Sequence, residues 1–184
     1  MRKDFGVKPW LFPQPVLIIG TYDKEGKPNA MNAAWGGTYD MDKVIIALSN
    51  HKTTENLKFS KAFSLSFGTK KTAAISDYVG VVSQNNEPDK MKKAGLHAVK
   101  SSNVNAPLFE EYPLTMECVV DSFDEVNEVL IGKVVNISVD ESIIKDNKID
   151  TDALEALVFD PINHKYRLVG ESVADAFKIG FSLR

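Results

Sequence analysis

NAMNAAWGGTYDMDKVIIALSNHKTTENLKFSKAFSLSFG, residues 29–68, decides the fold. This stretch predicts a strand, a turn, a second strand, a polar loop, a short helix and a third strand. The first strand, Asn29–Trp35, carries small alanines that allow a neighbour to pack closely. The second, Val44–Leu48, is apolar throughout, so we expect it to be buried on both faces. A helix over Glu55–Lys61, with Thr53 or Thr54 as its N-cap, leads into the alternating, half-buried strand Ala62–Gly68.

The polar loop of this stretch, Ser49–Thr54, runs directly into the predicted helix. It offers the cationic Lys52, the titratable His51 and the hydroxyls of its threonines at one place. The first N–H groups of a helix lack partners within the helix, so such a loop can hold a phosphate without being rich in glycine. Two simpler roles stay open: Lys52 can be a solvated surface lysine, and the threonines can act only as helix caps.

Just upstream of the second strand, Trp35 stands beside Gly36 and Gly37. A large flat side chain therefore adjoins backbone with little side-chain cover. Tryptophan usually packs in a core, and that role remains the alternative. Next to a phosphate-binding loop, however, the pattern favours an aromatic surface that lies along a planar, nucleotide-like cofactor.

Strand-like runs outnumber helical ones along the whole chain. The strand Val16–Tyr22 ends at a turn that contains Gly26 and Pro28, and Leu114–Ser122 and Glu128–Val139 predict a pair of long strands. The alternation of strand and helix that builds a parallel doubly wound sheet is absent. We therefore predict a mainly β, α+β fold: an antiparallel, closed or nearly closed barrel with short peripheral helices, in a single domain over residues 1–184.

Shorter elements complete the prediction. Helices are expected over Thr72–Val82 and Asp89–Ala94, the second of them ending at Gly95. Thr151 is expected to cap a helix through Leu157, and a chain reversal is expected between residues 158–160 and 166–168. The tail, residues 171–184, fits either a loose helix or a docking arm.

Composition excludes several function classes. The net charge of −3 and the scattered Lys and Arg residues argue against a nucleic-acid-binding surface. The proline-broken N-terminus does not fit a signal peptide, and the longest apolar run is far below the ~20 residues that span a bilayer, so we expect a soluble, cytoplasmic protein without a membrane partner. The one cysteine, Cys118, lies in an apolar run and predicts a buried thiol.

No catalytic side chain or metal site is predicted. The three histidines, His51, His97 and His164, are widely separated and lack metal-ligand spacing. Serine, histidine and carboxylate do not cluster in a pattern that indicates nucleophilic catalysis. A G-x-G-x-x-G motif after a strand is also absent, so NAD(P)H, if used, is not held by a Rossmann unit.

Several segments together resemble the flavin reductase-like, FMN-binding split-barrel proteins, and within them the flavoredoxin-type branch. The similarity covers nearly the whole chain and rests on the order and spacing of five stretches. They are residues 26–37 (GKPNAMNAAWGG), 49–57 (SNHKTTENL), 112–118 (YPLTMEC), 131–141 (IGKVVNISVDE) and 166–171 (YRLVGE).

The resemblance implies an antiparallel split β-barrel with non-covalent FMN, usually at a homodimer interface. It also implies electron transfer, either from NAD(P)H to the flavin or between FMN and a redox protein partner. Carried over by position, it assigns the ring and ribityl contacts to Asn29, Asn32 and the backbone of Ala33, Ala34 and Trp35. It assigns the phosphate contacts to Ser49, Lys52, Thr53 and Thr54, and a further cofactor contact to Lys90.

The chain departs from the family pattern at two places. Family members commonly carry Ser-Gly where this chain has Ser83 and Gln84, which removes easy access to positive φ before the helix that carries Lys90. The basic residue of the phosphate loop is often arginine, while here the candidates are His51 and Lys52. Because lysine is a point charge without a bidentate fork, we expect salt to weaken FMN binding more than at an arginine site.

Three functions agree with this sequence: an NAD(P)H-dependent flavin reductase, an FMN electron carrier without NAD(P)H activity, and a non-catalytic flavin-binding module. The flavin itself carries hydride or single electrons, so the lack of a catalytic cluster does not argue against an oxidoreductase. If the assigned pocket is correct, Trp35→Ala and Lys52→Ala should weaken FMN binding more than they disturb the fold.

Overall fold

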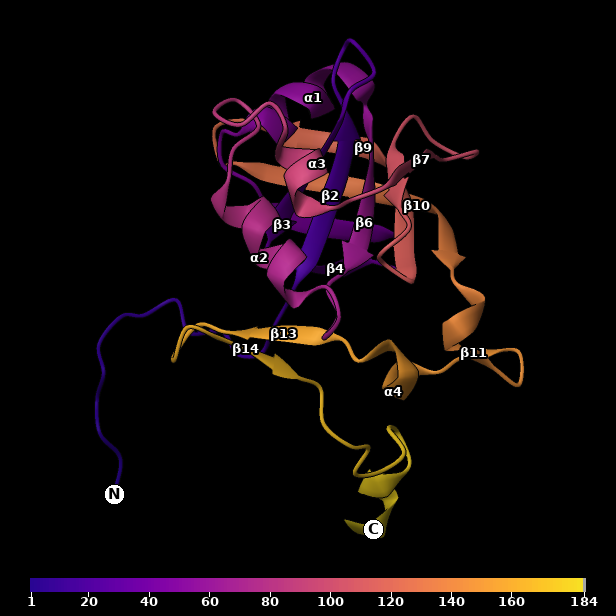
Figure 1. Cartoon of the computed structure of the whole chain (residues 1–184). Helices are drawn as coiled ribbons and strands as arrows, with labels where there is room; N and C mark the ends of the chain where they lie inside the picture. The colour runs from indigo at the N-terminus through magenta and orange to yellow at the C-terminus, as the bar shows by residue number, and fades with distance from the viewer. Residues whose placement is uncertain (184) are drawn as a thin grey trace.

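Seven strands form one curled antiparallel sheet, a half-barrel, in the computed structural model, which describes residues 1–183 (Figure 1). The predicted antiparallel barrel is thereby confirmed. The order across the sheet is β3-β2-β6-β9-β10-β5-β4, so the two edge strands follow one another directly in the chain. The strands are β2 (Leu17–Tyr22), β3 (Pro28–Ala33), β4 (Gly36–Asp40), β5 (Lys43–Ala47), β6 (Ala62–Phe67), β9 (Leu114–Asp124) and β10 (Val129–Val139).

Short elements surround this sheet. A three-stranded sheet joins β1 (Gln14–Pro15) to the hairpin β13–β14 (Leu157–Asp160 and Lys165–Leu168), which confirms the predicted reversal. Two further pairs are β7–β8 (Ala98–Lys100 and Pro107–Phe109) and β11–β12 (Ile144–Lys145 and Lys148–Ile149). The helices are α1 (Lys52–Ser60), α2 (Ala73–Val81), α3 (Lys90–Ala94) and α4 (Thr151–Leu154), with 3-10 turns over Glu141–Ile143 and Ile179–Leu183.

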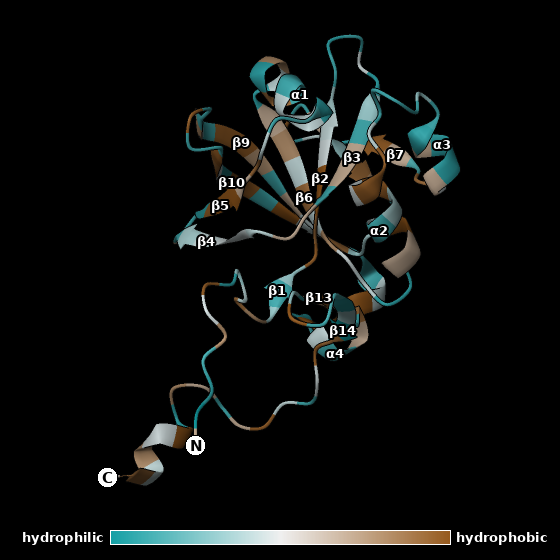
Figure 2. Cartoon of the chain, turned by 90° about the vertical axis from the view of Figure 1, so that its left-hand side faces the viewer, coloured by the Kyte–Doolittle hydropathy of each residue, from teal (hydrophilic) through white to brown (hydrophobic). Residues whose placement is uncertain are grey.

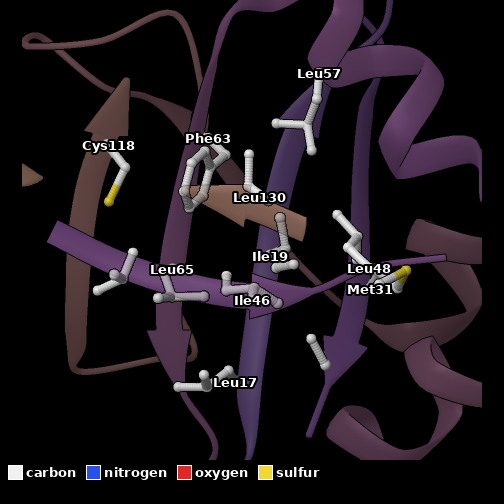
Figure 3. Close-up of a cluster of buried hydrophobic side chains, with 12 residues drawn as sticks. Leu17, Ile19, Met31, Ile46, Leu48, Leu57, Phe63, Leu65, Cys118 and Leu130 are labelled. Carbon is white, nitrogen blue, oxygen red and sulfur yellow. The ribbon is translucent and has the colours of Figure 1, made fainter. Parts of the chain in front are cut away.

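The main core fills the concave side of the sheet. Figure 3 shows Phe63, Ile46 and Leu130 meeting there, and Leu57 enters this core from α1. Cys118 belongs to the same core and is buried, as predicted, and burial raises the pKa of its thiol to about 12. Successive side chains of a strand point to opposite faces of the sheet, so about every second strand residue contributes its side chain to this core. Its buried members are Leu17, Ile19, Met31, Ala33, Val44, Ile46, Leu48, Leu57, Phe63, Leu65, Cys118 and Leu130.

A second core lies on the convex side of β2 and β3. There Ile18 and Ala30 pack against Val79 of α2 and Met91 of α3. The strands β2 and β3 are therefore covered on both faces. This double cover holds α2 and α3 firmly beside β3, and that placement creates the candidate site.

The expectations for strands β4 and β5 are wrong. Residues 36–40, predicted as a turn, form the edge strand β4, because their backbone pairs with β5 in the register Gly37↔Ile45. In β5, Val44 and Ile46 are buried while Ala47 is exposed, so only one face is covered. The reason is that α2 and α3 cover the other end of the sheet, which leaves the convex side of β5 open.

Two predicted helix caps are also wrong. Helix α1 begins at Lys52, and its N-cap is His51 in an extended conformation rather than Thr53 or Thr54. The Thr54 hydroxyl instead accepts from the His51 N–H at 2.9 Å, the reciprocal half of a capping box. Helix α4 is capped by Asp150 rather than Thr151, since the Asp150 carboxylate accepts from two backbone N–H groups of the first turn.

Both chain ends extend away from the barrel, on the side of the β13–β14 hairpin (Figures 1 and 2). They carry large apolar side chains that stay exposed, among them Leu11, Val173 and Phe177. The tail, which could have been a loose helix or a docking arm, is an extended arm that ends in an exposed 3-10 turn. Within residues 1–183, no helix combines the length and the apolar character needed to cross a bilayer.

Candidate functional site

A polar groove lies between strand β3, the first turn of α1 and the segment that joins α2 to α3. Its volume is about 220 Å³. None of its lining residues is an aspartate or a glutamate, while two are lysines. The lining residues are Asn29, Met31, Asn32, His51, Lys52, Thr53, Val79, Gly80, Val81, Val82, Ser83, Gln84 and Lys90.

The first turn of α1 forms one end of the groove. The N–H groups of Lys52 and Thr53 donate to no acceptor within residues 1–183, as expected for the start of a helix. The Lys52 ammonium is half-buried and only loosely paired, 3.3 Å from Glu55. Free N–H groups, the positive end of the helix dipole and a lysine together suit an anionic group such as a phosphate.

Asn29 holds the middle of the groove and has an unmet hydrogen-bonding capacity. Its side chain is 1% exposed, and its amide nitrogen donates to the Thr53 hydroxyl at 2.9 Å. Its Oδ1 atom is the one buried side-chain oxygen or nitrogen among residues 1–183 that lacks a partner. Leaving a buried acceptor unpaired costs about 1–3 kcal/mol. A ligand that donates to this oxygen would recover that energy.

Lys90 enters the groove from α3 and is almost fully buried. Its ammonium donates to the carbonyl of Ala30 at 2.7 Å and to the carbonyl of Val79 at 2.9 Å. These two bonds fasten α3 to β3 and to α2. Burial lowers the pKa of Lys90 to about 8, because the charged form loses its hydration.

A second hollow, here called the end hollow, adjoins the polar groove and has a volume of about 190 Å³. The two share Asn32, Gly80 and Val81 as lining residues. At its far side the Tyr166 hydroxyl donates to Asp77 at 2.8 Å, which ties the β13–β14 hairpin to α2. Burial and this carboxylate raise the pKa of Tyr166 to about 12. The groove and the end hollow together give an elongated site with a cationic end and a more apolar end.

The structure brings five of the predicted site residues into the polar groove: Asn29, Asn32, Lys52, Thr53 and Lys90. Ala34 lines the end hollow instead. Asn29 and Asn32 lie on β3, Lys52 and Thr53 lie at the start of α1, and Lys90 lies on α3. The phosphate end and the middle of the predicted site are thus adjacent in space.

The other four predicted residues lie elsewhere. The Ala33 side chain is in the main core, the Ser49 hydroxyl lies 3.0 Å from a ring nitrogen of His51, and Thr54 turns to the opposite side of α1. Trp35 is 55% exposed and lines an apolar shelf with Trp10, Leu11 and Ile45. This shelf shares no lining residue with the polar groove, so a contact between Trp35 and the cofactor stays a prediction.

Sequence reasoning missed the helical wall of the groove. Residues 79–84, at the end of α2, line it opposite β3. Gln84 is buried and its side-chain amide donates to the Pro28 carbonyl at 3.2 Å, so this residue closes the loop where the family often has glycine. Gly80 was the available signal, because a Cβ there would lie 2.9 Å from the Cβ of Asn32 and only glycine allows α2 to approach β3.

Comparison with known proteins found a matching family and several similar solved structures. The sequence model of the family described as "Flavin reductase like domain" matches residues 10–161. Flavoredoxin of Desulfovibrio vulgaris (Miyazaki F) is 31% identical and has a TM-score of 0.93, with 98% of this chain and 100% of that chain covered.

Two further solved structures share the fold at lower identity. For flavoredoxin from Methanosarcina acetivorans the identity is 22% and the TM-score 0.87, covering 100% of this chain and 98% of that one. An FMN-binding domain of a flavin reductase-like enzyme from Shewanella baltica OS155 is 18% identical and has a TM-score of 0.79. The match covers 88% of this chain and 89% of that chain.

Proposed function

Because the chain belongs to the flavin reductase-like domain family, we propose that it is a cytoplasmic FMN-binding oxidoreductase that holds its flavin in the polar groove. The observation that carries this proposal is the buried, unpaired Oδ1 of Asn29, a residue that lines a groove with a phosphate-type site at one end. In this proposal the site residues are those of the groove together with the backbone around Ala33, Ala34 and Trp35.

The residues present fit FMN. The free N–H groups of α1, Lys52 and the Thr53 hydroxyl suit a terminal phosphate. Asn29 and Asn32 suit the hydroxyls of a ribityl chain or a ring N–H, which can donate to the open oxygen of Asn29. A cofactor pocket usually measures roughly 300–1,000 Å³, so the ring must extend beyond the polar groove, and the end hollow offers the adjoining space.

When bound, the flavin supplies the electron-transfer chemistry, and the chain positions it and tunes its environment. Lys52 and the start of α1 anchor one end. Asn29, held by Thr53, is oriented before the ligand arrives, which reduces the entropy lost on binding. Residues 79–84 and Lys90 form the wall that keeps water from one side of the ligand.

The electron donor distinguishes the two leading functions. The flavoredoxin neighbours favour an electron carrier with a redox protein partner, and the family description favours reduction by NAD(P)H. The purified protein should be yellow, or should stay yellow after incubation with FMN and removal of the unbound flavin by gel filtration. Rapid anaerobic bleaching of that colour by NADH or NADPH supports the reductase, and bleaching only by dithionite supports the carrier. A protein that is colourless after incubation with FMN and removal of the unbound flavin contradicts both.

We also propose a homodimer, supported by the apolar arms that extend from each end of the chain. Leu11 is 75% exposed and Phe177 is 97% exposed, a surface that a second copy can cover. The variant Leu11→Asp/Phe177→Asp should therefore dissociate at about 100-fold higher protein concentration than wild type, since two charges would enter an apolar interface.

Light scattering after size-exclusion chromatography measures this change. Val126→Asp is the matched control, because Val126 is 90% exposed in the β9–β10 turn, outside both arms. An arm variant that dissociates at the same concentration as the control would show that the arms do not form the interface.

A further inference from the structure

Lys90 is a buried cation without an anionic partner. Its side chain is 2% exposed, and no carboxylate within residues 1–183 lies within ion-pair distance of its ammonium. The carbonyls of Ala30 and Val79 occupy two of its three N–H donors. One donor remains, and Lys90 lines the polar groove.

A purely structural role explains this arrangement poorly. Burying an unpaired charge is costly, and lysine is almost never fully buried unless it is paired. If Lys90 only had to fill space between α3 and β3, a methionine or leucine would do so without that cost. The charge therefore indicates that a negative or electron-rich group joins it when the groove is filled.

The charged groups around Lys90 do not supply that partner. On its own helix Lys93 pairs with Glu87, 2.5 Å away, and Asp89 is exposed. From α1 the groove receives His51 and Lys52, and Lys52 has Glu55 as its neighbour. Strand β3 contributes asparagines, and from α2 the ionisable Asp77 and Tyr78 are not among the groove's lining residues. The empty groove thus presents positive charge without a carboxylate.

The point at which Lys90, on α3, contacts strand β3 lies away from the phosphate end of the groove. Lys52 and Thr53 lie at the first turn of α1, and Thr53 is bonded to Asn29. Lys90 is bonded to the next residue, Ala30, and to Val79 on the opposite wall. Its ammonium therefore lies past Asn29, on the side where the groove continues toward Asn32 and the end hollow.

We propose that Lys90 makes the site bind reduced FMN more tightly than oxidised FMN, by placing a positive charge beside the flavin ring. This inference rests on the proposed function. Two electrons and one proton convert the neutral oxidised ring into a reduced ring with one negative charge. The Lys90 ammonium offsets that charge and gains the partner that it lacks in the empty groove. Lys90 is accordingly a positioning and tuning residue, not an acid or base.

The test compares dissociation constants for oxidised FMN and for FMN reduced anaerobically with dithionite. In Lys90→Met the preference for the reduced form should fall at least tenfold at pH 7, about 30 mV in a two-electron potential. Lys90→Arg, which keeps the charge, should retain most of the preference. Lys92→Met is the matched control, because Lys92 is exposed on the same helix and its side chain makes no hydrogen bond or ion pair within residues 1–183.

Repeating the titrations with riboflavin, which lacks the phosphate, distinguishes an interaction of Lys90 with the flavin ring from an interaction with the phosphate. The proposal expects Lys90→Met to lose the same preference for reduced riboflavin. A loss that appears only with FMN and equally in both redox states would assign Lys90 to the phosphate and overturn the proposal.

The wild type alone provides a second check that does not depend on the variants folding. The Lys90 ammonium is present below its pKa of about 8 and is lost above it. The preference for reduced FMN should therefore decline as the pH rises through that value, and more steeply than in Lys90→Met. Parallel pH profiles would overturn the proposal while leaving FMN binding intact, whereas a wild type that binds no FMN would overturn the proposed function itself.

Discussion

Asn29→Leu should lower the affinity for FMN by about tenfold to hundredfold, because a buried acceptor in the groove is lost, an effect on the order of 1–3 kcal/mol. The ligand-free variant should nevertheless unfold within about 1 kcal/mol of the wild type. Leucine removes the hydrogen bond to Thr53 but also removes an unpaired buried oxygen, so the two effects offset each other. A residue that served only the fold would show the opposite pattern.

Fluorescence quenching of FMN gives the dissociation constant, and urea denaturation of the ligand-free protein gives the stability. Asn86→Leu is the matched control, since Asn86 is exposed in the loop between α2 and α3 and makes no side-chain hydrogen bond to any of residues 1–183. If Asn29→Leu destabilises the ligand-free protein strongly and leaves the dissociation constant unchanged, Asn29 is a structural residue and the groove is wrongly assigned.

Gly132→Ala should destabilise the protein by about 1–3 kcal/mol, the usual cost of overpacking a core. Gly132 lies on β10 opposite the fully buried Phe63, and an added Cβ would lie 2.7 Å from one ring carbon of Phe63 and nearer still to another. The ring cannot turn away without displacing the main core. Urea denaturation midpoints at constant m-value measure the loss.

Two further variants test the cause. Gly37→Ala is the control, because Gly37 also lies in a strand but a Cβ there meets no atom within 4 Å. Phe63→Leu replaces the ring with a shorter side chain that lacks the clashing carbons. Gly132→Ala should therefore cost less in that background than in the wild type, as expected when two residues in contact are coupled. Equal costs in both backgrounds would mean that contact with the Phe63 ring is not the cause of the loss.

The sequence predicted most of the sheet because strand alternation is a local signal. The alternation of Phe63, Leu65 and Phe67 with serines correctly marked β6 as a strand. The half-buried character predicted for it is wrong, because Ser64 and Ser66 on the other face are fully buried as well. Strand β4 was missed because Gly36 and Gly37 lack side chains and read as a turn, while the pairing with β5 that makes them a strand is a tertiary effect. The N-cap of α1 was misplaced for a similar reason, since the Thr53 hydroxyl is engaged by Asn29, a residue 24 positions away.

The candidate site was predictable where it follows contiguous residues and unpredictable where it depends on packing. Lys52 and Thr53 could be predicted as phosphate contacts because they belong to a polar loop that runs directly into a helix. Lys90 came from the family resemblance alone, because an isolated lysine in KMKKA has no signal of burial. Its burial arises from the second core, where Met91 and Ala94 hold α3 against β3. The approach of α2 to β3 at Gly80 is likewise visible only in three dimensions.

The unmet oxygen of Asn29 has a consequence for the protein in a living cell. Under the proposed function, a bound flavin that donates to this oxygen would remove an energetic penalty from the folded state alone, and a ligand at 100 times its dissociation constant adds about 2.7 kcal/mol to folding stability. Newly made chains that lack their vitamin-derived partner would populate unfolded forms more often and be degraded sooner. Riboflavin supply would thereby set how much of this protein accumulates, and not only how much of it is active.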